Sequence, residues 1–266
     1  LPYPSSQEGG VILSLGGRDN LTGNELPKLL LKSKRESFRG QHVGINLFST
    51  LSSNLNENQK QDFDSILGNS LNLESAISRN IWSAAEKDGG AATNTARLNL
   101  QLGLLLLSSS ALFEDSVSAS LIASAVAEVL LDTEVSDLAY LLRNPVLMRH
   151  LVEEVTTTQG AIRIGESSIE ALADSLSSIN EVTWNPDIEI SGELMVGIVS
   201  AGQTVLVPAV EQLVQSGSSE SFLAIARIEK LLGDLSAEQS GRNTDGDSLI
   251  DLLDPDDDND EVNDSE

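Results

Sequence analysis

The last 24 residues of the chain, 243–266, are the part whose residue types and spacing indicate a specific chemistry. They contain nine Asp and two Glu and neither Lys nor Arg. Oxygen-bearing side chains recur there at an interval of thirteen residues. The first set is Asn243, Asp245, Asp247 and Asp251, and the second set is Asp256, Asp258, Asp260 and Asp264. Such a repeat of hard oxygen donors is typical of loops that surround a divalent cation.

The first set has the ligand spacing of a twelve-residue calcium loop. Counted from Asn243, side-chain donors fall at positions 1, 3, 5 and 9, Asp254 adds position 12, and Leu249 at position 7 offers its backbone carbonyl. A calcium ion takes about six to eight oxygen ligands, so we expect one complete site here. The second set predicts a weaker site, because its twelfth position would fall after Glu266.

This stretch resembles the thrombospondin type 3 repeat, D-x-D-G-D-G-x-x-D-x-x-D-P-D-D-D-N-D-G, which is common in bacterial secreted and outer-membrane proteins. The match covers residues 243–266 and includes Asp254-Pro255. The resemblance implies calcium binding outside the cell or on a bacterial cell surface. The family favours Gly at position 6, where this chain has Ser248 and Glu261. A non-Gly residue with positive φ costs roughly 1 kcal/mol, so we expect a dissociation constant of about 10⁻⁴ to 10⁻³ M.

The alternative interpretation of residues 243–266 is a solvated acidic tail, as most runs of like charge are. The thirteen-residue interval favours metal binding over that alternative. So do four apolar residues inside the acidic run, which are Leu249, Ile250, Leu252 and Leu253. We therefore predict a calcium-binding segment, with Ca²⁺ as the cofactor.

The charge and the missing cysteines limit the classes of partner and site. The net charge is −25, of which residues 243–266 contribute −11 and residues 1–242 contribute −14. Nucleic acid and anionic membrane surfaces repel such a protein and are not expected as partners. Without cysteine, the chain can form neither disulfide bonds nor thiolate metal sites. Because it opens on Leu1, we expect a mature exported form whose signal peptide has been removed.

The remaining sequence predicts an all-α fold, a multi-helix, bundle-like body followed by the acidic calcium-binding loops. Three regions are expected. They are an extended arm over residues 1–24, in which Val11–Leu15 can form a short strand, a helical domain over 25–242 that can break near 181–192, and the calcium-binding segment over 243–266.

Capping residues, glycines and apolar periodicity place the helices. The clearest start is Asn144-Pro145, a capping side chain before proline at the first helical position. Leu147, Leu151 and Val155 are the expected buried face of that helix, and Gly160 its end. A first helix is expected over 24–40, and further helices over 45–55, 63–68, 72–89, 97–113, 117–131, 169–179, 194–199, 205–214 and 222–232.

The sequence contains no recognisable catalytic motif. The only histidines are His42 and His150, and HExxH, G-x-S-x-G and glycine-rich phosphate loops are absent. Beside His150, the spacing predicts ion pairs of Arg149 with Glu153 and of His150 with Glu154 on an outer helix face. We therefore expect no enzyme, although a pocket that joined His150 to carboxylates would favour one.

Together these features predict an exported calcium-binding structural or interaction protein of a cell surface or extracellular assembly. Its expected partners are calcium and either another protein or a second copy of the chain. The longest aliphatic stretch, Leu98–Phe113, is too short and too polar to cross a bilayer, so no membrane span is expected. The alternative function is a helical carrier of an apolar, lipid-like ligand with a calcium-stabilised tail.

Overall fold

The all-α prediction is confirmed for the part of the chain that the structure, a computed structural model, describes. This part comprises residues 11–15, 30–34, 46–56, 58–59, 61, 90–114, 122–132, 138–184, 197–199 and 202–226. Its α-helices are α1 (Leu47–Ser52), α5 (Gly90–Ser110), α7 (Ile122–Asp132), α8 (Leu138–Arg143), α9 (Pro145–Thr157), α10 (Glu166–Trp184), α12 (Val207–Ser216) and α13 (Ser219–Ala226). A π-helical turn, η2 (Gly202–Leu206), precedes α12, and strands β1 (Val11–Leu15) and β2 (Leu30–Lys34) form a small sheet.

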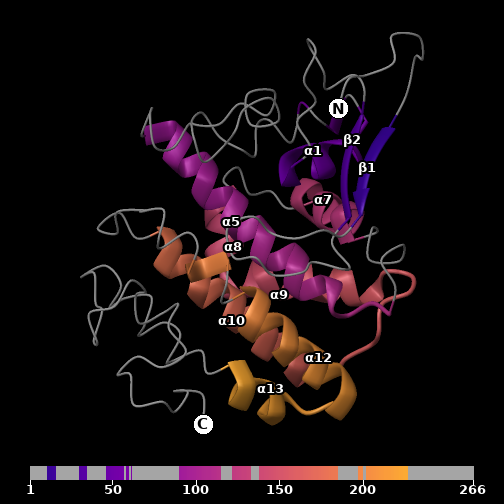
Figure 1. The fold of residues 1–266 in the computed structure, drawn as a ribbon, viewed down its shortest axis with the longest axis vertical. Helices are drawn as coiled ribbons and strands as arrows, with labels where there is room; N and C mark the ends of the chain where they lie inside the picture. The colour runs from indigo at the N-terminus through magenta and orange to yellow at the C-terminus, as the bar shows by residue number, and fades with distance from the viewer. Residues whose placement is uncertain are drawn as a thin grey trace.

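Helix α5 runs through the middle of the body (Figure 1). Its buried leucines are Leu98, Leu100, Leu102, Leu104, Leu105 and Leu106. Because these positions point in nearly all directions around the helix axis, α5 has to be surrounded by other elements. It contacts α1, α7, α8, α10, α12 and η2. The core of the described body is therefore built around α5.

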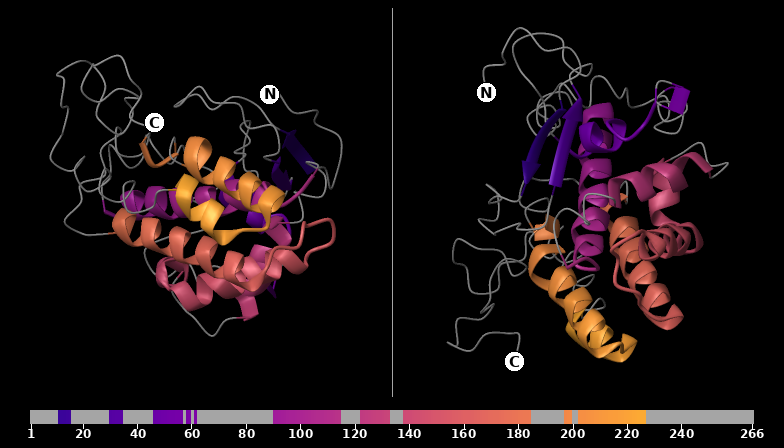
Figure 2. Two further views of the ribbon diagram at one scale, coloured as in Figure 1. Left: turned by 90° about the horizontal axis from the view of Figure 1, so that it is seen from below. Right: turned by 90° about the vertical axis from the view of Figure 1, so that its right-hand side faces the viewer.

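The other helices lie around α5 in two groups (Figure 2). Helices α8, α9 and α10 pack against one another, and α7 packs on α9. Helices α12 and α13 form a second pair, joined through Gly217, whose φ of 66° ends α12 in the left-handed conformation that glycine favours. Helix α13 also contacts α10, which connects the two groups.

Helix α9 begins where the sequence predicts. Asn144 caps it, and its side-chain Oδ1 accepts hydrogen bonds from the backbone N–H groups of Val146 (3.0 Å) and Leu147 (3.2 Å). Leu151 and Val155 are buried as expected, whereas Leu147 is half-buried. The helix ends at Thr157, and Gly160 follows with a φ of 89°.

The N-terminal region corrects one prediction. Val11–Leu15 is a strand, as proposed, but the helix expected over residues 24–40 is wrong for Leu30–Lys34, which form β2. The strands are antiparallel, with Val11 opposite Lys34 and Leu15 opposite Leu30. The helix was inferred from start and end signals at Asn24, Pro27 and Gly40, which do not exclude a strand between them, and pairing with β1 selects the strand.

Two helix boundaries also differ from prediction. Helix α10 continues to Trp184, past the start of the connection expected over 181–192, and residues 185–192 lie outside the described part, so the break itself stays a prediction. Helix α5 begins at Gly90 rather than Arg97. Its first turn consists of Gly90, Ala91 and Ala92, which lack the large apolar side chains that a periodicity argument detects.

The π-helical turn η2 comes directly before the predicted helix start at Pro208. Proline has no N–H to donate, and its ring clashes with the carbonyl four residues earlier in a regular helix, which explains the wider turn here. By length and composition alone, the stretch Gly197–Ser216 could cross a membrane, and 44% of its most apolar window is buried inside the body. A helix in the core of a soluble protein can have the same length and apolar composition, so this stretch does not decide between the two. The absence of a membrane span therefore stays a prediction.

Candidate functional sites

The predicted calcium site falls on residues that the structure does not describe. This applies to Asn243, Asp245, Asp247, Leu249, Asp251, Asp254, Asp256, Asp258, Asp260 and Asp264, and also to His42. Within the described residues, no group of three or more His, Asp or Glu side chains could hold a metal ion. The calcium assignment therefore continues to depend on the spacing of donors in the sequence.

The charged face of α9 is only partly as predicted. Arg149 pairs with Glu153, with Nε 3.0 Å from Oε1, and its Nη2 also lies 2.7 Å from Oε1 of Glu166 on α10. Hydrogen bonds to Glu153 and then Glu166 raise the pKa of Arg149 above its ordinary value. His150 is exposed, and no ion pair with Glu154 is present among the described residues. Arg149 thus links α9 to the start of α10 at the protein surface, and these ion pairs have a structural role.

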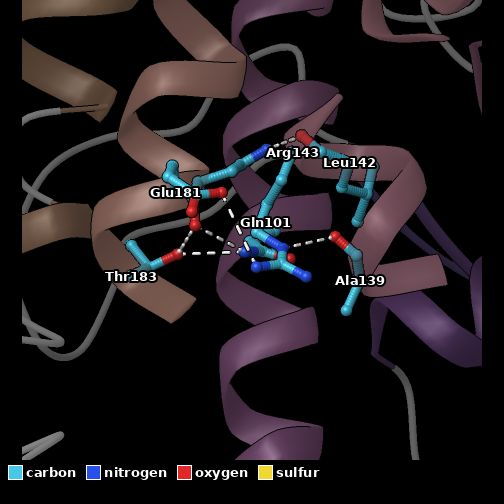
Figure 3. Close-up of polar contacts among 7 residues, drawn as sticks. Gln101, Ala139, Leu142, Arg143, Glu181 and Thr183 are labelled. Carbon is cyan, nitrogen blue, oxygen red and sulfur yellow. Dashed lines mark hydrogen bonds and ion pairs between the residues drawn. The ribbon is translucent and has the colours of Figure 1, made fainter. Parts of the chain in front are cut away.

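A buried polar cluster joins α5, α8 and α10 (Figure 3). Gln101 Nε2 on α5 donates to the backbone oxygen of Asn180 (3.0 Å) and to Oγ1 of Thr183 (3.0 Å), both on α10. Asn180 Nδ2 donates to the backbone oxygen of Leu142 on α8 at 2.8 Å. Gln101, Asn180 and Thr183 are fully buried. We call these three side chains and the Leu142 carbonyl the polar junction.

Two arginines approach Trp184 at the end of α10, near the polar junction. The Cζ atoms of Arg97 and Arg143 lie 5.8 Å and 5.5 Å from the centroid of its ring, within cation–π range. Arg143 Nε also donates to the backbone oxygen of Ala139 at 2.9 Å, and its Nη1 is 3.6 Å from Oε2 of Glu181. Partial burial lowers the pKa of Arg97, because desolvation penalises the charged form. These contacts fasten the C-terminal end of α10 to α5 and α8.

The chemistry of the polar junction is structural. Amides and a threonine hydroxyl without a neighbouring base supply neither an activated nucleophile nor a proton-transfer group. Gln101 Oε1 and Asn180 Oδ1 have no hydrogen-bond partner within the described part of the chain. Burying amides is unfavourable unless they are bonded, so the three donated hydrogen bonds favour one relative position of the helices. Sequence reasoning missed this cluster, although single amides within the apolar stripes of both helices were a signal for it.

A second surface feature is an open groove between α10 and α13. It has a volume of about 310 Å³ and is lined by Ser167, Glu170, Ala171, Asp174, Ser175, Ser178, Ser219 and Leu223. Glu170 and Asp174 are exposed, and Leu223 is 49% exposed. We call this the acidic groove, and it combines carboxylates with an apolar side chain.

Comparison with known proteins adds no relative. No protein-family model, characterised protein or solved structure matches this chain.

Proposed function

We propose that this chain is an exported protein that binds calcium through residues 243–266 and uses the ordered segment for contacts at a cell surface or in an extracellular assembly. The observation that carries the proposal is the thirteen-residue repeat of Asn and Asp donors, whose first set occupies calcium-loop positions. The helical body then serves as a platform, to which residues 227–242 connect the segment.

Calcium would act on this segment through its charge. Eleven acidic residues lie within 24 positions, and their mutual repulsion favours an extended chain when no cation is bound. Each bound calcium replaces part of that repulsion with attraction and closes a loop. The four apolar residues among the acids, Leu249, Ile250, Leu252 and Leu253, would then be held in fixed positions for contact with the body or a partner.

Calorimetric titration of the full chain with calcium tests the ligand assignment. Asp247→Ala should remove the heat of the stronger site, since position 5 of the loop loses its oxygen donor. Asp257→Ala is the matched control, because it removes the same charge from the same acidic run at a position outside the predicted ligand set. Equal losses in both variants would show that calcium only screens a diffuse acidic tail, and the proposal would be wrong.

Light scattering across a calcium series tests the use of the ordered segment. We expect the mass of the full chain to rise with calcium, and the rise to weaken in a variant with Leu252→Ser and Leu253→Ser. An unchanged mass from chelator to about 10 mM calcium, well above the expected dissociation constant, would reject calcium-dependent self-association. The segment would then be a stiff spacer or a site for another protein.

A further inference from the structure

Two buried side-chain oxygens of the polar junction accept no hydrogen bond from the described part of the chain. They are Oε1 of Gln101 and Oδ1 of Asn180, and both residues are fully buried. Buried amide oxygens are nearly always bonded to protein or to ordered water, because an unbonded one loses its hydration without compensation. The two oxygens belong to one cluster, since Gln101 Nε2 lies 3.0 Å from the backbone oxygen of Asn180. Each of them needs a donor.

The orientation of each amide is fixed by the group that its nitrogen contacts. Gln101 Nε2 donates to the backbone oxygen of Asn180, and Asn180 Nδ2 donates to the backbone oxygen of Leu142 at 2.8 Å. A carbonyl oxygen can only accept, so turning either amide over would bring two acceptors together. In Figure 3 the dashed lines from the Gln101 side chain leave from its nitrogen. The oxygens are therefore the atoms that still need a partner.

The hydrogens of Gln101 and Thr183 are already in use within the junction. Gln101 Nε2 directs its two hydrogens to the Asn180 backbone oxygen and to Oγ1 of Thr183. The hydroxyl of Thr183 donates its single hydrogen to the same backbone oxygen at 2.8 Å. No other group in the described part donates to Gln101 Oε1 or Asn180 Oδ1. A small bound molecule can supply the donors.

The neighbouring arginines favour a neutral molecule over a cation. Trp184 follows Thr183 directly, and the Cζ atoms of Arg97 and Arg143 lie 5.8 Å and 5.5 Å from the centroid of its ring. Another positive charge would be repelled by these guanidinium groups, and repulsion is strong where water is excluded. A calcium ion would also need about six to eight oxygens. Water is neutral, carries two O–H donors and commonly bonds buried polar groups of this kind.

We propose that the polar junction binds one buried water, which donates its two hydrogens to Gln101 Oε1 and Asn180 Oδ1. The water connects α5 to α10 a second time, beside the direct bonds from Gln101 Nε2. Both amides are then bonded at nitrogen and at oxygen, which strengthens the preference for one relative position of the helices. This site lies in the helical body and goes beyond the proposed function, since it involves none of residues 243–266.

Water–amide Overhauser spectra of the isotope-labelled full chain in chelator test the site. We expect the side-chain NH₂ protons of Gln101 and Asn180 to show cross-peaks to water. Their sign should be that of a water that stays bound for longer than the protein takes to tumble, which distinguishes it from rapidly exchanging surface water. Resolved NH₂ signals from both residues without a water cross-peak at either would overturn the proposal.

Gln101→Met tests whether the water needs both acceptors. Methionine has nearly the length of glutamine and can fill the same space, but it lacks the accepting oxygen. The water cross-peak at the Asn180 NH₂ group should be lost in this variant. Leu102→Met, at the next fully buried position of α5, is the matched control and should keep it. A cross-peak at Asn180 that survives Gln101→Met unchanged would mean that no water bridges the two amides, and the proposal would be wrong.

The hydroxyl of Thr183 has its own control, because a hydroxyl proton that exchanges with solvent can pass a water signal to a neighbouring amide. Thr183→Val removes this proton and keeps the shape of the side chain, while Gln101 Nε2 keeps its bond to the Asn180 backbone oxygen. We expect both water cross-peaks to persist. Their loss, with the helical circular dichroism signal unchanged, would assign them to the hydroxyl and overturn the proposal. Calcium titration tests the proposed function separately, so the two proposals can fail independently.

Discussion

Helix α10 carries two polar surfaces that differ in what surrounds them. Near its C-terminal end, Asn180 and Thr183 are fully buried and bonded to Gln101 on α5. Nearer its start, Glu170 and Asp174 are exposed in the acidic groove. Because both surfaces belong to one helix, the neighbouring elements decide the difference. Polar groups that bond inside the body fix helix packing, and those that remain in water are available to a partner.

The largest effect is expected inside the polar junction. Asn180→Ala removes the hydrogen bond to the Leu142 carbonyl and leaves a buried space, so the free energy of unfolding should fall by about 2 to 4 kcal/mol. Urea denaturation followed by circular dichroism measures this change. Ser178→Ala, on the groove side of the same helix, should stay within about 0.5 kcal/mol. Similar losses in both variants would contradict the distinction between the two surfaces.

A medium effect is expected at the start of α9, where a half-buried side chain bonds to the backbone. Asn144→Ala leaves the N–H groups of Val146 and Leu147 without their cap and should lower the free energy of unfolding by about 1 kcal/mol. Asn144→Asp keeps the accepting oxygen and should recover most of that loss. If the Asp variant is as unstable as the Ala variant, the cap is not what stabilises this helix start.

A still smaller effect on stability is expected in the acidic groove. Asp174→Asn removes repulsion from Glu170 one turn earlier, so stability should be unchanged or rise by about 0.2 to 0.5 kcal/mol. Thermal unfolding monitored by circular dichroism can resolve this change from the loss expected at Asn180. Destabilisation by more than about 1 kcal/mol, outside the usual range for surface substitutions, would mean that this carboxylate supports the fold rather than a partner.

The smallest effect on the body is expected from calcium. Since the described helices bury their own core, chelation should leave the helical circular dichroism signal nearly unchanged. Residues 243–266 should at the same time become easier to cleave by protease, because an acidic segment without its cation buries too little apolar surface to fold. Loss of most of the helical signal in chelator would place the ion inside the body instead.

Local signals predicted much of the body correctly. Asn144 and Pro145 marked the start of α9, because a cap and a proline act within a few residues of their own position. The leucines of α5 also indicated a helix, because apolar periodicity is a pattern of positions close together in the sequence. The spacing of the calcium donors is also local, which is why the candidate metal site could be read from residues 243–266 and still stands as a prediction.

Features made by distant residues could not be predicted in this way. Gln101 meets Asn180 and Thr183 across 79 and 82 positions of sequence, and neither helix alone indicates the other. The strand β2 depends on pairing with β1, which the helix start and end signals on either side of it do not reveal. The acidic groove likewise needs α13 beside α10, so Leu223 had no reason to stand out among the other apolar residues of the sequence.

The register of the β1–β2 sheet has a mechanical consequence. Val11 lies opposite Lys34, so the chain leading toward the N-terminus and the chain leading on to α1 leave the sheet at the same end. A pulling force between β1 and the helices would therefore load the five residue pairs one after another, as in opening a zipper, and not all together. Peeling would free residues 11–29, which extend to about 60 Å, while β2 stays packed on α1. A tether attached ahead of β1 would thus lengthen before tension reached the core.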